Sequence, residues 1–202
     1  MSALYQSGFH GSFESQKETL INILLKNKSM HEVFETAEKH LKDYYVGAGF
    51  IFQTVWNYLS GFPLDYGIGD VDIVYFDRED LSIETEKELE SQISETLKHL
   101  PFKIDVKNEA RVHLWYEKKF GYPIAPYQSM EDAIDTWPTT ASSIGVKKKE
   151  AGYEVYAPFG LEDLVEMVVR PNKTLITKEI YESKAVKWKN KWPKLTVIPW
   201  DV

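Results

Sequence analysis

Apolar residues recur along the chain with two periods, and each period predicts a type of element. Residues 15–24 and 29–41 repeat apolar positions every three to four residues, as amphipathic helices do. Both stretches open with Ser-x-x-Glu, a sequence typical of a capped helix start, so we expect Ser15 and Ser29 to cap two helices. Residues 50–59 are apolar on nearly every side and predict a buried helix. Further helical spacing is found in residues 84–98, 130–135, 161–168 and 178–189.

Strand-like stretches alternate with these helices. Residues 44–46, 71–76 and 102–106 are rich in β-branched and aromatic side chains, and residues 142–148 and 153–156 predict a hairpin. This order is typical of an α/β (α+β) fold in which helices flank a mixed sheet. No internal repeat or low-complexity linker divides the chain. We expect residues 1–202 to form a single compact unit, with residues 1–42 as a helical pair packed on it.

Composition narrows the class of protein. Hydrophobic residues make up 43% of the chain and aromatic residues 14%, which suits a well-filled core. The absence of cysteine excludes disulfides, thiolate metal sites and cysteine nucleophiles. Residues 1–11 lack the features of a signal peptide, and no apolar run approaches the roughly 20 residues that a membrane helix needs. We therefore expect a cytoplasmic protein with no membrane partner.

Charge bears on the partners. The formal net charge is −7, which argues against a broad nucleic-acid-binding face but not against a small phosphorylated ligand held by a metal. Lysines nevertheless concentrate late in the chain, at Lys147, Lys148, Lys149, Lys178, Lys184, Lys187, Lys189, Lys191 and Lys194. They predict a solvated charged face, with a tail that contacts a polyanion as the alternative.

The strongest chemical motif is Gly69-Asp70-Val71-Asp72 at the start of a predicted strand. Side chains two residues apart on a strand point the same way, so Asp70 and Asp72 share a face about 6–7 Å apart. Two such carboxylates repel each other unless a cation or solvent neutralises them, and hard oxygen ligands suit Mg²⁺ or Mn²⁺. The alternative is a pair of exposed aspartates at the mouth of a strand.

Two neighbouring features strengthen the metal hypothesis. Gly47-Ala48-Gly49 connects a predicted strand to the buried helix, where backbone amides can approach a phosphate. Tight packing of strand on helix is the alternative explanation for these glycines. Asp105 lies on the next predicted strand, where it can join the first two carboxylates, complete a metal clamp or accept a proton.

These residues resemble the nucleotidyltransferase superfamily, to which CCA-adding enzymes and poly(A) polymerases belong. Residues 45–52, followed by Asp70-Val71-Asp72-Ile73, are similar to the head-domain pattern of those enzymes. The chain is also similar, over most of its length, to a group of small bacterial nucleotidyltransferase-like proteins. The residues that carry this resemblance are 70–77, 106–115, 157–164 and 169–172.

The resemblance implies a metal-dependent transfer of a nucleoside monophosphate from an NTP to a hydroxyl on a small molecule, a protein or an RNA. The implied metal ligands and catalytic residues are Asp70, Asp72 and Asp105, and the implied phosphate contacts are Gly47, Ala48 and Gly49. We also expect Lys107 and Arg111 to contact the nucleotide. Two positions depart from the superfamily pattern. Ala48-Gly49 replaces the usual Gly-Gly or Gly-Ser pair, and Phe52 replaces an Arg often found one helix turn later.

Residues 108–116 mix polar and aromatic side chains. If this stretch is extended, Arg111, His113 and Trp115 share a face, on which a nucleotide or acceptor can stack and pair. An amphipathic strand with an ordinary histidine is an equally good explanation.

Two other functions compete with nucleotidyl transfer. The departures at Ala48 and Phe52 favour a nucleotide-binding or regulatory module that kept the fold without turnover. Asp105-Val106-Lys107 also matches half of a common nuclease motif, with Asp72 as the upstream acid. The helix predicted between these two strands and the acidic net charge argue against a nuclease.

Overall fold

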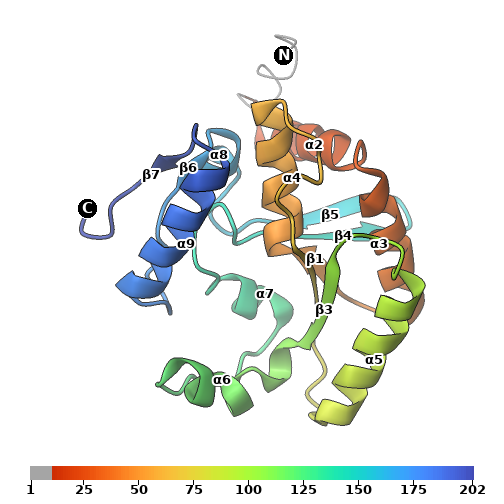
Figure 1. Ribbon diagram of the computed structural model, residues 1–202. Coiled ribbons are helices and arrows are strands. Elements are labelled where there is room, and N and C mark those ends of the chain that lie inside the picture. Colours follow the sequence, from red (N-terminus) through yellow and green to blue (C-terminus); the bar gives the residue numbers. More distant parts are fainter. Residues whose placement is uncertain (1–10) are drawn as a thin grey trace.

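A five-stranded mixed sheet organises the chain, in the order β3-β2-β1-β4-β5 (Figure 1). The computed structural model describes residues 11–202, so most of the segment in which no signal peptide is predicted lies outside the described residues. Strands β2 and β3 are parallel, and the other neighbours are antiparallel. The strands are β1 (Tyr45–Gly47), β2 (Asp70–Tyr75), β3 (Lys103–Asn108), β4 (Gly145–Lys149) and β5 (Gly152–Tyr156).

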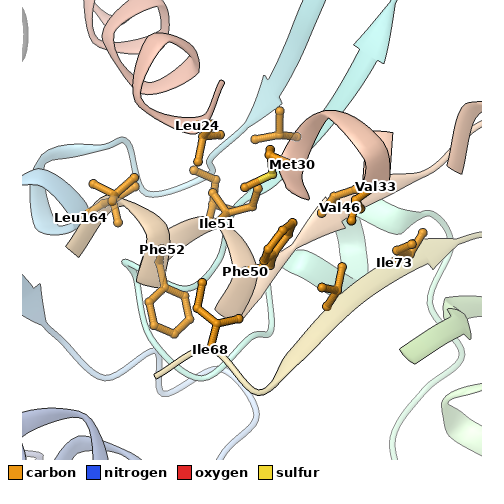
Figure 2. Close-up of a cluster of buried hydrophobic side chains, with 14 of the residues drawn as sticks. Leu24, Met30, Val33, Val46, Phe50, Ile51, Phe52, Ile68, Ile73 and Leu164 are labelled. Atoms are coloured by element: carbon orange, nitrogen blue, oxygen red, sulfur yellow. The ribbon is translucent and has the colours of Figure 1, made fainter. Parts of the chain in front are cut away.

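Four helices cover one face of the sheet and bury the main core. They are α2 (Phe13–Leu24), α3 (Lys28–His40), α4 (Ala48–Ser60) and α5 (Ile83–Thr96). Helix α4 is buried continuously from Gly49 to Asn57, as its apolar composition predicts. Its Phe50 and Ile51 pack among Leu24, Met30 and Ile73, which Figure 2 shows converging from α2, α3 and β2. The order of elements confirms the predicted mixed sheet flanked by helices in one compact unit.

The opposite face of the sheet carries the site and is covered differently. Alternation along the strands turns Tyr45 and Val74 to this face, where they pack against Met130 and Ile134 of α7 (Met130–Ile134). The remaining elements are the 3₁₀ turn η1 (Glu109–Arg111), α6 (His113–Phe120), α8 (Glu162–Val165), β6 (Val168–Val169), α9 (Lys178–Lys191) and β7 (Thr196–Val197). Within residues 11–202, no helix combines the length and apolar character needed to cross a bilayer.

Helix α9 is fastened to α4 by aromatic rings. The rings of Phe52 and Trp56 on α4 lie 5.0 Å and 5.8 Å from that of Trp188 on α9. Trp192, just after α9, is fully buried and donates its indole N–H to Asn57 Oδ1 over 2.8 Å. These contacts fix the position of α9 against α4.

Several predicted boundaries are wrong. Ser12 caps α2 by accepting from the Ser15 amide, and Asn27 caps α3 by accepting from the Ser29 amide, so each helix starts earlier than predicted. The predicted helix over residues 161–168 is shortened to α8. Met167 adopts a left-handed conformation with φ of 58°, after which β6 pairs with β7.

The predicted extended stretch over residues 108–116 is also wrong, because it folds as η1 and α6. Asn108 Oδ1 accepts from the Ala110 amide and starts the turn. Val112, Tyr116 and Phe120 recur every four residues, and the last two rings lie 4.5 Å apart. The apolar residues thus have helical spacing, and the chain follows that spacing rather than the strand-like alternation of Arg111, His113 and Trp115.

We predict that Trp192→Ala lowers the free energy of unfolding by about 3–5 kcal/mol, because it empties a fully buried site and leaves Asn57 Oδ1 unpaired. Urea unfolding measures the change. Val186→Ala is the control, since Val186 on α9 is 61% exposed and its loss is expected to cost less than about 0.5 kcal/mol. Equal effects of the two substitutions would contradict the anchoring role of Trp192.

Candidate active site

Strand register brings the predicted carboxylates together. Asp70 and Asp72 lie on one face of β2, and Asp72 pairs with Asp105 on β3 and with Gly47 on β1. Asp105, Asp72 and Gly47 thus form a row across three adjacent strands. Asp70 is exposed at the start of β2, whereas Asp72 and Asp105 are half-buried.

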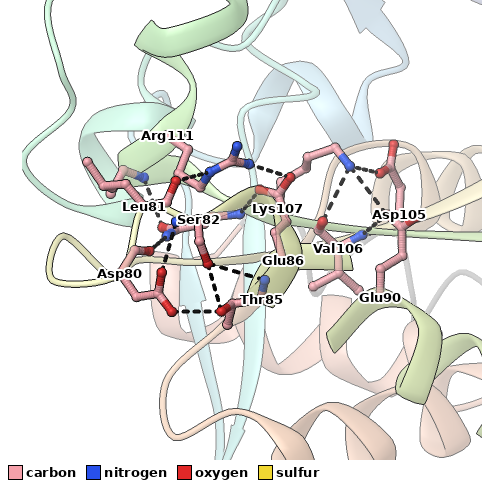
Figure 3. Close-up of polar contacts among 12 residues, drawn as sticks. Asp80, Leu81, Ser82, Thr85, Glu86, Glu90, Asp105, Val106, Lys107 and Arg111 are labelled. Carbon is pink, nitrogen blue, oxygen red and sulfur yellow. Dashed lines mark hydrogen bonds and ion pairs between the residues drawn. The ribbon is translucent and has the colours of Figure 1, made fainter. Parts of the chain in front are cut away.

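Asp105 is held by lysines on its own strand. Lys107 forms an ion pair with it, and Lys103 Nζ lies 4.0 Å from Asp105 Oδ2. Lys107 also reaches Glu90 Oε2 of α5 over 3.3 Å (Figure 3). Burial raises the pKa of Asp105, but the hydrogen bond and charge of Lys107, together with Lys103, outweigh burial and lower that pKa overall. Asp105 is therefore ionised at neutral pH.

The turn from β1 into α4 approaches the carboxylates closely. Gly47 caps α4 without any side-chain hydrogen bond, and Ala48 adopts the left-handed region with φ of 47°. A Cβ on Gly49 would lie 2.7 Å from Gln53 Nε2 and 3.8 Å from Asp70 Oδ1. A Cβ on Gly47 would lie 2.4 Å from the Trp137 ring. Gly47 is thus required for packing, whereas Gly49 keeps the start of the helix open towards Asp70.

Two hollows adjoin the carboxylates. The smaller, of about 250 Å³, is lined by Gln53, Gly67, Gly69, Asp70, Lys103, Lys187, Trp188 and Lys191. The larger, of about 430 Å³, will be called the aromatic cleft. It is lined by Asp105, Lys107, Glu109, Val112, Trp115, Tyr116, Lys119, Phe120, Tyr127, Thr136, Trp137, Pro138, Leu175, Ile176, Ile180 and Lys184.

Lysines of α9 face both hollows. Lys184 lines the aromatic cleft and Lys187 lines the smaller hollow. Burial lowers the pKa of Lys184 overall, although the nearby charges of Asp72 and Asp70 raise it. Part of the late lysine cluster therefore lies at the carboxylates rather than on a solvated face. The sequence showed the cluster but not that α9 folds back onto the site.

Comparison with known proteins decides the family. A family model described as nucleotidyltransferase matches residues 35–197. The chain belongs to this nucleotidyltransferase family. A solved structure whose title reads "The NMR structure of the protein reveals a CCA-adding enzyme head domain" is similar, with 25% identity and a TM-score of 0.74 over 90% of this chain and 95% of that one. A comparison with curated proteins found no match.

The nucleotidyltransferase family typically uses divalent metals, and the site fits one in part. Asp70 and Asp72 offer hard oxygen donors on one face. Burial, followed by the charges of Asp70 and Asp105, raises the pKa of Asp72 to about 7, a repulsion that a cation would relieve. Residues 11–202 contain no group of three His, Asp or Glu side chains arranged to hold a metal. The third carboxylate, Asp105, is instead bound to Lys107.

Arg111 and Lys107, the remaining predicted nucleotide contacts, make bonds inside the protein. Arg111 is buried, with Nη1 donating to Glu86 Oε1 over 2.7 Å and Nε donating to the Leu81 carbonyl over 2.8 Å (Figure 3). Lys107 binds Asp105 and Glu90. These contacts join β3 and η1 to α5 and to the loop before it.

Sequence reasoning missed Glu109, although it lies within a string that carries the family resemblance. Glu109 is only 7% exposed and lines the aromatic cleft. Burial, followed by the charges of Asp72 and Glu86, raises its pKa to about 8. The turn that residues 109–111 form at the end of β3 places Glu109 in the cleft, and the sequence pattern did not predict that turn.

The raised pKa of Asp72 predicts an effect of pH on stability. The folded protein keeps a proton on Asp72 up to about pH 7, whereas the unfolded chain loses it near pH 4. Asp72 therefore lowers the free energy of unfolding progressively as pH rises from about 4 to about 7, and above that pH its contribution no longer changes. Without metal, we expect Asp72→Asn to raise the free energy of unfolding by about 1–3 kcal/mol at pH 8 and to change it little at pH 4.

Urea unfolding at the two pH values measures this difference. Asp65→Asn, which removes an exposed carboxylate in the loop before β2, is the control and should have little effect at either pH. A gain for Asp72→Asn that is the same at pH 4 and pH 8 would show that the charge of Asp72 is not its cause.

Proposed function

We propose that the protein transfers a nucleoside monophosphate from an NTP to a hydroxyl acceptor with a divalent metal. The observation that carries the proposal is the row of Gly47, Asp72 and Asp105 across adjacent strands, with Asp70 next to the open start of α4. This arrangement stands in a chain that belongs to a nucleotidyltransferase family.

Asp70 and Asp72 are the residues proposed to hold Mg²⁺ or Mn²⁺. When bound, such a metal neutralises the charge that develops on phosphoryl oxygens and orients the reacting groups. A bound cation would favour the ionised form of Asp72, which burial and the neighbouring carboxylates otherwise disfavour.

The triphosphate is proposed to lie over the turn at Gly47–Gly49. The Ala48 amide already donates to the Ile144 carbonyl, so the amides that follow it and the positive end of the helix are what favour an anion there. The smaller hollow beside Asp70 adds Lys103 and Lys187, whose charges suit the β- and γ-phosphates.

In the proposed step, the acceptor hydroxyl oxygen bonds to the α-phosphorus while the bond to the bridging oxygen of the β-phosphate breaks. Pyrophosphate leaves with the electron pair of that bond. Asp105, kept ionised by Lys107, can accept the hydroxyl proton as the new bond forms. Lys103 and Lys187 stabilise the leaving pyrophosphate.

We predict that Asp105→Asn abolishes transfer but changes NTP affinity less than about threefold, because the phosphate contacts and Asp70 and Asp72 remain. The assay follows label from the α-phosphate of each of the four NTPs, with Mg²⁺ or Mn²⁺, into a metabolite extract, total RNA or the protein itself. Calorimetry measures NTP affinity, and Asp65→Asn is the control. If the Asp105→Asn variant transfers label at the wild-type rate, Asp105 has no part in the mechanism.

A binding module without turnover is the second candidate. It is supported by the ion pair that occupies Asp105 and by Phe52, whose ring packs 4.6 Å from that of Trp56 and offers nothing to a phosphate. This candidate predicts that NTP and Mg²⁺ bind but that no label moves to any acceptor. The nuclease hypothesis has less support, since Lys107 is bound to Asp105 and Glu90 and the chain belongs to a nucleotidyltransferase family.

A further prediction concerns Gly49. Gly49→Ala places a methyl group between the start of α4 and Asp70, and we expect NTP affinity to fall about fivefold or more. Gln53 can move aside, and Ala is a better helix residue than Gly, so stability should stay the same or rise. Calorimetry and thermal unfolding measure the two effects. Lower stability with unchanged affinity would favour the packing explanation of this glycine.

A further inference from the structure

The two hollows lie on opposite sides of the Asp72–Asp105 pair along the strands. The smaller hollow includes Asp70 and its register partner Lys103, two residues before the pair. The aromatic cleft includes Lys107 and Glu109, two and four residues after Asp105. In an in-line displacement, the attacking oxygen and the leaving pyrophosphate lie on opposite sides of the phosphorus. If pyrophosphate leaves on the side of the smaller hollow, where the proposed function puts the β- and γ-phosphates, the acceptor enters from the aromatic cleft.

The walls of the aromatic cleft suit a flat ring. Trp115, Tyr116 and Phe120 of α6 face it from one side, and Trp137 and Ile180 contribute further apolar surface. Its volume of about 430 Å³ lies within the range of small-molecule pockets. The net charge of −7 disfavours a long nucleic-acid backbone, and the cleft offsets its lysines, Lys107, Lys119 and Lys184, with the carboxylates of Asp105 and Glu109.

The hydroxyl groups of the cleft wall already have hydrogen-bond partners within the protein. Tyr127 Oη and Thr136 Oγ1 are 2.7 Å apart, and Tyr116 Oη lies 3.2 Å from the Tyr122 hydroxyl. They therefore gain little from a ligand.

Glu109 is different. It is more than nine-tenths buried and lines the cleft. Its backbone carbonyl accepts from the Val112 amide, but its carboxylate forms no hydrogen bond or ion pair with any residue of 11–202. A buried carboxyl without a partner costs stability, and a ligand hydroxyl or amine in the cleft would supply the missing partner.

We propose that the aromatic cleft binds the acceptor, a nucleoside-like compound with a planar ring and hydroxyl groups. Its ring packs against Trp115, and a polar group hydrogen-bonds to Glu109 at the floor of the cleft. A hydroxyl of the same molecule is then directed towards Asp105. The acceptor is thus a small molecule rather than an RNA or a protein, an inference that rests on the proposed function.

The first test measures binding without metal or phosphate. Adenosine, guanosine, cytidine and uridine are titrated into the full chain by calorimetry, and at least one is expected to bind. Glu109→Leu should raise its Kd at least about tenfold while thermal stability stays the same or increases, because an unpaired buried carboxyl is removed. Glu117→Leu, on the exposed side of α6, should leave the Kd unchanged. Trp115→Ala should also weaken binding, and it keeps the test decisive if Glu109→Leu does not fold.

Two results of this titration would overturn the proposal. One is that no nucleoside binds, or that binding is unaffected by both cleft substitutions. The other is that a saturating non-hydrolysable NTP displaces the nucleoside, which would make the cleft the pocket for the NTP's own base.

The labelled-transfer assay separates failure of this inference from failure of the proposed function. Label is expected in a product of nucleoside size, and Glu109→Leu should reduce its formation. Label in RNA or protein instead would overturn the cleft assignment and leave the proposed function standing. Cleft-dependent nucleoside binding with no transfer to any acceptor would contradict the proposed function and, with it, the acceptor role of the cleft.

Discussion

The crowding of carboxylates where β2 runs beside β3 is the constraint on which the rest of the site depends. Asp72 lies between Asp70 on its own strand and Asp105 on the next, and burial weakens the screening of their repulsion by water. The chain offsets this from two directions: Lys107 binds Asp105 from within β3, and Lys184 approaches from α9. A divalent cation would offset it further. An arrangement that costs stability in the empty protein is therefore well suited to metal and phosphate.

A buried polar network fixes the edge of this site. The side-chain amide of Asn108 donates to the backbone carbonyls of Asp77 and Asp80. The carboxylate of Glu86 accepts from the backbone N–H of Asn108 and from the guanidinium of Arg111. Because these bonds tie the end of β3 to the loop and helix that follow β2, they set where η1 turns. That turn directs Glu109 into the cleft and starts α6. Residues 108–111 thus include both Arg111, which forms a buried ion pair, and Glu109, whose buried carboxylate has no partner in the described part of the chain.

Local sequence patterns predicted the strands of the main sheet but not β6 and β7. They also predicted the buried helix α4 and the meeting of Asp70, Asp72 and Asp105, because a helix between two parallel strands lets those strands lie side by side. They failed where contacts between residues far apart in the sequence determine the structure. Arg111 has the residue type of a phosphate ligand, and only its burial against Glu86 shows a structural role. Residues 108–116 alternate like a strand, yet the spacing of Val112, Tyr116 and Phe120 favours α6. The placement of Lys184 and Lys187 depends on how α9 docks, which their own neighbours in sequence do not reveal.

Phe52, which stands where the superfamily pattern often has an Arg, links the packing of α4 to the positive charge at the site. An Arg at this position on α4 would bring positive charge near the phosphate turn, whereas Phe52 is buried against Trp56 and Trp188. The same aromatic contact docks α9 on α4, and docking brings Lys187 to the hollow beside Asp70 and Lys184 to the cleft beside Asp105. Positive charge that α4 lacks is thus supplied by a helix more than 120 residues later in the chain. The packing of Phe52 and the placement of Lys184 and Lys187 therefore depend on the same contact between α4 and α9.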